Sequence, residues 1–217
     1  MIRIENATGV YPPSEDSDLL LEAVKYARGE VLDMFAGSGI VGLSAAPLAR
    51  KVTFVDVSTA ALASVRLNAK LNGIKNYEIV KSNLFTKLNG RSFDTIYMNP
   101  PYLSGVRKKS DSLDTAIIGG HKGYETTLRA VDGLRAHLKP GGEAFLILST
   151  VYDINKVYKH LMSFSLEFKV LDIRRFFFEE LVLLRIYEKR RYSDGKWANY
   201  SGGIDKFNRT GTPSKGH

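Results

Sequence analysis

A stiff corner in the middle of the chain brings together groups that could bind an amine. The run FDTIYMNPPYL ends a strand-like segment with Asn99, Pro100, Pro101 and Tyr102. Proline has no backbone N–H, fixes its own φ and pushes the preceding residue into an extended conformation. We therefore expect the side-chain oxygen of Asn99 and the carbonyl of Pro100 to be fixed acceptors without a competing donor.

Two such acceptors suit the two hydrogens of a planar –NH2 group. The nitrogen of an amide or an aromatic amine is a poor nucleophile because its lone pair is delocalised. Binding both hydrogens orients the nitrogen and stabilises the positive charge that develops on methylation, while Tyr102 can stack on the flat group. The proton can leave afterwards, so no general base is required before the attack. The alternative is an ordinary turn after a strand, where Asn-Pro is common.

A glycine-rich loop lies upstream, in VLDMFAGSGIVG. Gly37, Gly39 and Gly42 have the spacing G-x-G-x-x-G, and Asp56 follows in the next strand-like segment. This pattern is typical of dinucleotide-binding loops, so a dehydrogenase has to be considered.

Asp33 favours a different ligand. It precedes Gly37 by four residues, where its carboxylate would face the ligand and repel a pyrophosphate. S-adenosylmethionine (SAM) carries ammonium and sulfonium cations and no phosphate. We therefore predict a SAM site in which Asp33, Ala36, Gly37 and Gly39 contact the cofactor.

Two further polar residues follow predicted strands. Asp56 can accept both ribose hydroxyls, and Asn83 can accept from the adenine amino group. The alternative for the aspartates is capping or turn formation, and a lone asparagine is commonly a turn residue.

Strand-like and helix-like segments alternate along the chain, which predicts an α/β fold with a mostly parallel sheet. The expected strands are 30–35, 51–57, 76–82, 93–98, 143–149, 166–174 and 180–188. The expected helices are 15–27, with Ser14 as a plausible N-cap, 41–50, 59–71 and 124–138. The segment LKPGG predicts a break before the fifth strand, and residues 103–118 predict a long loop of the kind that often binds ligands.

Composition narrows the class of protein. The 217 residues contain no cysteine, which excludes disulfides and thiolate metal sites and fits the cytoplasm; no other metal site is predicted. No apolar run has the length of a signal sequence core or a membrane span. The net charge of +8 suggests an acidic partner such as RNA, although a solvated lysine-rich surface is the plainer reading. We expect one domain over residues 1–189 and a basic, flexible tail over 190–217 that either contacts nucleic acid or only aids solubility.

The residues between Val10 and Glu188 resemble class I SAM-dependent methyltransferases of the Asn-Pro-Pro-Tyr type. The resemblance is strongest to the HemK-like release-factor glutamine methyltransferases. It rests on five features of the sequence: VYPPSEDSDLLLEA, LDMFAGSGIVG, Asp56, NPPYL and GGHKGYE. The compact archaeal and eukaryotic branch of this family lacks the bacterial N-terminal helical domain, as this chain does.

The resemblance implies several structural properties. It implies a seven-stranded Rossmann-like sheet in the order 3-2-1-4-5-7-6, with the seventh strand antiparallel and helices on both faces. It implies SAM contacts, or positions beside the methyl group, for Ser17, Asp33, Asp56, Asn83, Leu84 and Asn99. It also implies a small zinc-binding activator protein at the edge of the third strand, NYEIVKS.

Three positions depart from the family pattern. Ser17 replaces a threonine and keeps the hydroxyl, and Asn83 stands where an aspartate is usual. Phe35-Ala36 replaces a glycine-containing pair, as in loops of RNA methyltransferases.

Three functional hypotheses remain at this point. The first is methylation of a glutamine side chain in a peptide chain release factor, with Asn99, Pro100 and Tyr102 as catalytic residues. The second is methylation of an exocyclic amine in RNA or DNA, with Arg107–Lys109 and the tail holding phosphates. The third is a SAM-binding scaffold without activity.

Overall fold

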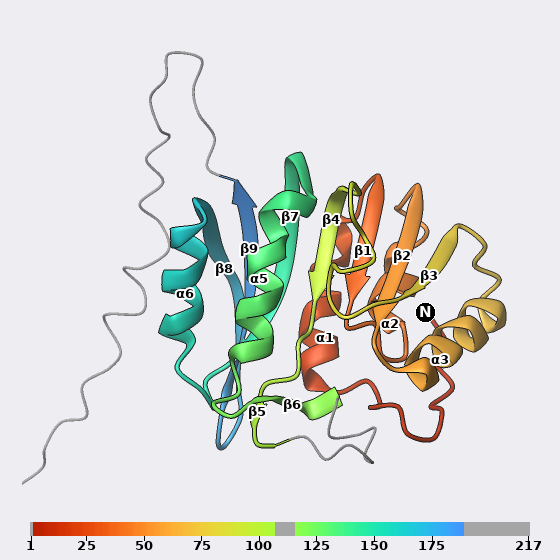
Figure 1. The fold of residues 1–217 in the computed structure, drawn as a ribbon. Coiled ribbons are helices and arrows are strands. Elements are labelled where there is room, and N and C mark those ends of the chain that lie inside the picture. Colours follow the sequence, from red (N-terminus) through yellow and green to blue (C-terminus); the bar gives the residue numbers. More distant parts are fainter. Residues whose placement is uncertain (1, 107–115, 189–217) are drawn as a thin grey trace, which may run out of the picture.

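A seven-stranded sheet forms the centre of the molecule (Figure 1). The computed structural model describes residues 2–106 and 116–188. The strand order in this sheet is β3-β2-β1-β4-β7-β9-β8. The strands are β1 (Glu30–Met34), β2 (Lys51–Asp56), β3 (Tyr77–Lys81), β4 (Phe93–Met98), β7 (Leu138–Ser149), β8 (Leu166–Arg175) and β9 (Glu180–Glu188).

The order and direction of these strands confirm the expected topology. Strands β3, β2, β1, β4 and β7 pair in parallel, whereas β9 is antiparallel to both β7 and β8. Because β7, β8 and β9 are the fifth, sixth and seventh strands of the sheet, the order is the 3-2-1-4-5-7-6 that the family resemblance implied. The α/β prediction is correct.

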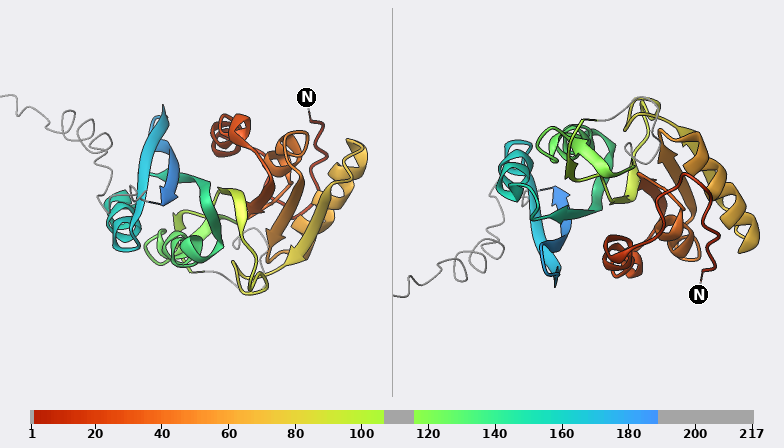
Figure 2. Two further views of the ribbon diagram at one scale, coloured as in Figure 1. Left: turned by 90° about the horizontal axis from the view of Figure 1, so that it is seen from above. Right: turned by 90° about the horizontal axis from the view of Figure 1, so that it is seen from below.

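Helices cover both faces of the sheet, as Figure 2 shows in two views along the sheet. The helices are α1 (Glu15–Leu21), the short 3-10 helix η1 (Val24–Tyr26), α2 (Ile40–Ala45), α3 (Thr59–Leu71), α5 (Glu125–His137) and α6 (Ile154–Ser163). Buried residues of α5 and α6 belong to one apolar cluster, and those of α1, α2 and α3 belong to the other.

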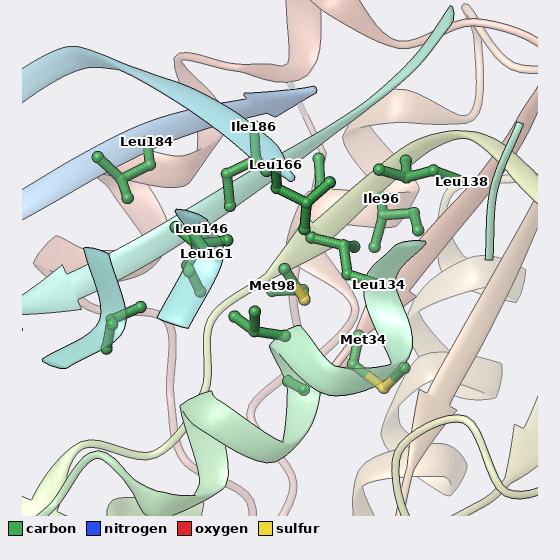
Figure 3. Close-up of a cluster of buried hydrophobic side chains, with 14 of the residues drawn as sticks. Met34, Ile96, Met98, Leu134, Leu138, Leu146, Leu161, Leu166, Leu184 and Ile186 are labelled. Carbon is green, nitrogen blue, oxygen red and sulfur yellow. The ribbon is translucent and has the colours of Figure 1, made fainter. Parts of the chain in front are cut away.

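The apolar cluster beneath α5 and α6 shows why the central strands have almost continuous apolar runs. Met34, Ile96 and Met98 on the sheet belong to one apolar cluster with Leu134 of α5 and Leu161 of α6, and all are nearly inaccessible to solvent (Figure 3). A strand covered on both faces buries successive side chains in opposite directions, so most of its positions are apolar. Each such side chain contributes about 1.5–3 kcal/mol on burial.

Several boundaries differ from the expected ones. Helix α1 ends at Leu21, and the chain continues in i→i+3 bonds, with Ala23 N donating to Leu20 O at 3.0 Å. Ser14 precedes α1 without a side-chain capping bond. Helix α2 ends at Ala45 rather than near Arg50. The sequence interpretation missed α6 entirely.

The expected break at LKPGG is a bulge within β7. Leu138 pairs with Phe93 and Glu143 pairs with Thr95, so the intervening residues bulge out without ending the strand. A side chain at Gly142 would lie 2.8 Å from Phe93 O, which explains why a glycine occupies this close approach.

The expected long loop after the Asn-Pro-Pro-Tyr corner contains two short paired strands, β5 (Leu103–Ser104) and β6 (Ile118–Gly120). Arg107–Lys109 and the tail at 190–217 lie outside the described residues. Among the described residues, no helix combines the length and apolarity needed to cross a membrane.

Candidate active site

A cavity of about 460 Å³ opens where the parallel strands end. This is the edge at which open α/β sheets bind ligands. Almost all the residues predicted from sequence line it: Ser17, Asp33, Ala36, Gly37, Asp56, Asn83, Leu84, Asn99, Pro100 and Tyr102. The structure thus brings together residues from four strand ends and from α1.

Gly39 is the exception. It does not line the cavity, but begins α2 with a φ of 83°. Its N–H donates to Ala36 O at 2.7 Å, and a Cβ there would lie 3.1 Å from the Val65 side chain. Gly39 therefore shapes the loop from behind, and the prediction that it contacts SAM directly is not supported by its position.

The backbone of the glycine loop explains an unusual feature of the sequence. Phe35 has a φ of 65°, in the left-handed region that favours glycine, and Gly37 has a φ of 52°. A bulky residue in this conformation costs roughly 1–3 kcal/mol. The Phe35 ring packs against the apolar cluster under α5, which offsets this cost. Phe35 therefore stands where a glycine would be unstrained, which accounts for the glycine-containing pair usual at this position.

Asp33 lies at the base of the cavity and is 3% exposed. Its Oδ2 accepts a hydrogen bond from Gly42 N at 2.8 Å. Burial raises the pKa of Asp33 from 3.8 to about 7, the bond from Gly42 acts against this, and the nearby Asp56 adds to the increase. The sequence interpretation assumed a full negative charge here. A carboxyl with a pKa of about 7 is only partly ionised at neutral pH, and a cationic ligand would favour its ionised form.

Asp56 closes the glycine loop at the end of β2. Its Oδ2 accepts from Gly37 N at 3.1 Å, and its Oδ1 accepts from Ser58 N at 2.8 Å. Burial raises the pKa of Asp56, while these backbone donors partly counteract the increase. Each carboxylate oxygen can accept more than one hydrogen bond, so both stay available to ligand hydroxyls.

Asn83 and Leu84 lie at the end of β3. Asn83 is exposed, and its Oδ1 accepts a long hydrogen bond of 3.3 Å from Arg129 of α5. Leu84 is buried with a left-handed φ of 52°. Arg129 also lines the cavity and was not predicted, because nothing in the sequence of α5 points to this edge.

The Asn-Pro-Pro-Tyr corner contains an unsatisfied acceptor. The Oδ1 atom of Asn99 is buried and accepts no hydrogen bond from any described residue. Pro100 and Pro101 beside it are buried and have no N–H to offer. A buried acceptor without a partner is unfavourable by roughly 1–3 kcal/mol, so a ligand donor would relieve this cost.

Tyr102 lies half-buried at the wall of the cavity and packs against both apolar clusters. Burial raises the pKa of its hydroxyl, and the negative charges of Asp16 and Glu179 raise it further. The ring is therefore neutral at physiological pH.

A glycine stretch supports the corner from outside. A Cβ at Gly119 would lie 2.4 Å from Pro101 O, and a Cβ at Gly123 would lie 2.4 Å from Tyr102 O. Glu125 accepts from Lys122 N at 3.0 Å and so holds the turn that contains Gly123. Only glycine permits the stretch GGHKGYE to lie this close to the backbone of the corner.

The sequence interpretation also missed lining residues from distant parts of the chain. Tyr11, Asp16, Thr126 and Glu179 line the cavity. Asp16 was within a recognised motif, whereas Glu179 comes from the turn between β8 and β9, and only the antiparallel last strand brings it here. Its position could not be read from local sequence.

Comparison with known proteins agrees with this architecture. Residues 2–170 match the family model described as the methyltransferase small domain. A relative from Methanocaldococcus jannaschii, provisionally named a protein N5-glutamine methyltransferase, is 32% identical over 86% of this chain and 95% of its own length. The ribosomal RNA small subunit methyltransferase C of Serratia proteamaculans is 37% identical over 53% of this chain but only 34% of its own length.

A solved structure with the same fold is that of Mtq2 in complex with Trm112 from E. cuniculi. The complex is described as responsible for the methylation of the translation termination factor eRF1. It has a TM-score of 0.66 and 22% identity, and it covers 83% of this chain and 99% of that chain. The present chain belongs to the methyltransferase small domain family. It is a SAM-dependent methyltransferase, as its sequence predicted.

The cavity fits SAM in its chemistry. The carboxyl of Asp33, whose pKa is raised by burial, is placed to gain a cation as partner, and Asp56 offers acceptors for hydroxyls. The backbone at Gly37 is open, since a Cβ there would meet only Phe35 O, at 3.9 Å. The contacts of the individual residues with SAM stay predictions.

Proposed function

We propose that this enzyme methylates the side-chain amide nitrogen of a glutamine in a peptide chain release factor. The observation that carries the proposal is the buried, unpartnered Oδ1 of Asn99 beside a proline carbonyl. This pair of acceptors matches the two N–H bonds of a carboxamide. The relatives from M. jannaschii and the eRF1-modifying complex support the same substrate class.

In this mechanism the residues of the chain bind and orient. Bound SAM supplies an electrophilic methyl group on a positively charged sulfur. Asp33 would hold its cationic part and Asp56 its ribose, with Ser17, Ala36, Gly37, Asn83 and Leu84 around them. Asn99 Oδ1 and Pro100 O would accept the two amide hydrogens, and Tyr102 would stack on the amide plane. The positive charge that grows on nitrogen is stabilised by these oxygens.

The charges that line the cavity favour a polypeptide over a nucleic acid. Among the described lining residues the acids outnumber the bases: Asp16, Asp33, Asp56 and Glu179 against Arg129. Asp33 and Asp56 are buried and assigned to the cofactor, so the acids that a phosphate backbone would meet in this lining are Asp16 and Glu179. The net charge of +8 is therefore not contributed by the lining residues that the structure describes.

Methylation of an exocyclic amine in RNA is the second candidate, because the same acceptors suit that group and the S. proteamaculans relative acts on ribosomal RNA by name. The two candidates separate in one experiment. Purified enzyme is incubated with labelled SAM and a release factor carrying Gly-Gly-Gln, or with RNA, and the product is treated with protease or nuclease. We expect the label in protein, and none when the glutamine of the substrate is replaced by leucine.

The variant Asn99→Ala tests the acceptor pair. Loss of a positioned partner for developing charge is expected to reduce the rate about 100-fold or more. The exposed Asn89, outside the cavity lining, provides the matched control Asn89→Ala, which should retain full activity. Undiminished methylation by Asn99→Ala would contradict the mechanism and favour a scaffold role.

We further propose that a small zinc-binding activator protein binds at β3, as the family resemblance implied. Strand β3 is an edge strand whose only neighbour among the described strands is β2, so one side of its backbone pairs with no described strand and could bind a partner. A shallow hollow beside it is lined by Arg66, Leu67, Lys70, Gly73, Ile74, Lys75 and Tyr77, and Leu67 is 44% exposed. Its three cations suit an acidic partner. Leu67→Asp should abolish co-purification of this partner, whereas Met162→Asp, at an exposed position on α6 beside β8 at the other edge of the sheet, should not. A release-factor substrate would place the enzyme in the cytoplasm, where translation occurs.

A further inference from the structure

The turn between β8 and β9 exposes three consecutive phenylalanines. Phe177 and Phe178 are 92% and 90% exposed, and Phe176 is 40% exposed. The rings of Phe177 and Phe178 contact each other edge to face, with centroids 4.6 Å apart. Adjacent large apolar side chains that pack on nothing else are uncommon on a protein surface and mark contact sites.

The turn that carries these rings is well defined. Phe176 N donates to Glu179 O at 2.8 Å, and the Arg175 guanidinium pairs with Glu180 at 2.8 Å across the two strands. Hydrogen bonds between β8 and β9 continue along both strands. The two rings are therefore presented on a rigid element, which reduces the entropy lost when they bind.

The turn lies at the rim of the cavity. Glu179 directly follows Phe178 and lines the cavity, and its charge raises the pKa of the Tyr102 hydroxyl after the larger effect of burial. Figure 1 shows this turn at the same end of the sheet as β5 and β6, which flank the Asn-Pro-Pro-Tyr corner. The two rings are therefore carried by residues directly before a lining residue of the cavity.

Among the described residues of this turn and of the first turn of α1, the unpaired charges are negative. Arg174 lies 3.6 Å from Glu22 and Arg175 is paired with Glu180, so neither arginine is left uncompensated. Glu15 and Asp18, both exposed on the first turn of α1, form no ion pair with the described residues. An anionic membrane or a phosphate backbone is disfavoured at such a rim, whereas a polypeptide with apolar and basic side chains is favoured.

We infer that Phe177 and Phe178 dock the substrate polypeptide, binding an apolar segment of the release factor with basic neighbours, outside the methylated glutamine. This inference rests on the proposed function and adds to it the surface that recognises the protein as a whole. Aromatic side chains at the centre of such contacts commonly carry much of the binding energy.

The test is the kinetics of the double variant Phe177→Ser and Phe178→Ser in the full chain. Both side chains are almost fully exposed, so the fold should be retained. With an intact release factor we expect KM to rise about tenfold or more, while kcat and the affinity for SAM stay unchanged. The control is Leu48→Ser, an apolar residue that is 54% exposed and precedes β2, four strands away from β9 in the sheet order.

Other outcomes overturn the inference in distinguishable ways. An unchanged KM in the double variant, with wild-type enzyme active on the release factor, refutes the docking surface and leaves the proposed function intact. Loss of binding to RNA or to anionic phosphatidylserine vesicles, again with KM unchanged, assigns the rings to those ligands. A wild-type dimer that the double variant dissociates, with KM unchanged, assigns them to self-association. Label that appears in RNA and never in the release factor refutes the proposed function, and the docking of that protein with it.

Discussion

Replacement of Asp33 by asparagine should separate the stability of the protein from its ability to bind SAM. The carboxyl is buried and receives one hydrogen bond from the described residues, from Gly42 N to Oδ2 at 2.8 Å. The side-chain oxygen of asparagine can accept the same bond. The substitution therefore removes the ionisable group while it keeps the shape and the contact with the glycine loop.

The size of the change in the free energy of unfolding follows from the pKa of Asp33. Burial raises the pKa of Asp33 from 3.8 to about 7. The folded protein thus binds the proton more tightly than the unfolded chain, so the free energy of unfolding decreases as pH rises from about 4 to 7 and is then constant. A shift of this size amounts to about 4 kcal/mol above pH 7. As pH rises from 5 to 8, the wild type should therefore lose about 2–3 kcal/mol in the free energy of unfolding, and Asp33→Asn should not show this loss.

The assays are chemical denaturation at both pH values and calorimetry of SAM binding. The variant should be more stable than wild type at pH 8 and should bind SAM weakly. A bound cation lowers the pKa of the carboxyl, so wild type should release close to one proton on binding near pH 6, measured in buffers of different ionisation enthalpy. A stability difference that does not change between pH 5 and pH 8 would refute the raised pKa. Unchanged SAM affinity in the variant would refute the role of Asp33 in binding.

Three further perturbations test the corner and the sheet. Gly123→Ala would place a Cβ 2.4 Å from Tyr102 O at a φ of 87°, so methyl transfer should fall about 100-fold, whereas Gly90→Ala, at a φ of 73° with open space, should cost only stability. Tyr102→Phe should retain activity within about twofold at pH 6 to 9, because burial raises the pKa of the hydroxyl and the ring is already neutral, whereas Tyr102→Ala should reduce kcat/KM about tenfold. Burial acts to raise the pKa of Glu78, but hydrogen bonds from neighbouring side chains outweigh it and lower the pKa to about 2. The contribution of ionised Glu78 to stability is present above pH 4.5 and is lost as pH falls toward 2. Glu78→Gln should therefore unfold at a lower urea concentration than wild type at pH 7, and its urea midpoint should change less between pH 5 and pH 2.

The sequence predicted those features whose causes are local. The parallel strands, the glycine loop and the Asn-Pro-Pro-Tyr corner follow from apolar runs, turn residues and proline geometry, and their residues converge at one cavity. Helix α6 also had a local signal, since Asp153 caps it and Ile154, Val157 and Leu161 are spaced as one buried face. That signal was overlooked.

Other features depend on tertiary structure. The ionisation of Asp33 depends on burial and on Asp56, which are set by two strands together. Glu179 and Arg129 reach the cavity from a distant hairpin and from α5. The strain at Phe35 is visible only in its φ, although the replacement of glycine at that position was evident from the sequence.

One electrostatic property connects these observations with the proposed reaction. The cofactor is cationic, and an amide nitrogen acquires positive charge as it accepts a methyl group. The cofactor and the reacting nitrogen are therefore both stabilised by oxygen acceptors and negative charge. The described cavity lining supplies them: it contains an unpartnered Asn99 oxygen and four acids, but neither histidine nor lysine. A histidine base would gain little here, because the amide proton becomes acidic only after methylation. Asp33 and Asp56 would serve cofactor binding, whereas Asp16 and Glu179 in the same lining would disfavour a phosphate group. Reversing one rim charge that touches neither ligand, as in Glu15→Lys, should therefore improve RNA binding without restoring any activity lost in Asn99→Ala.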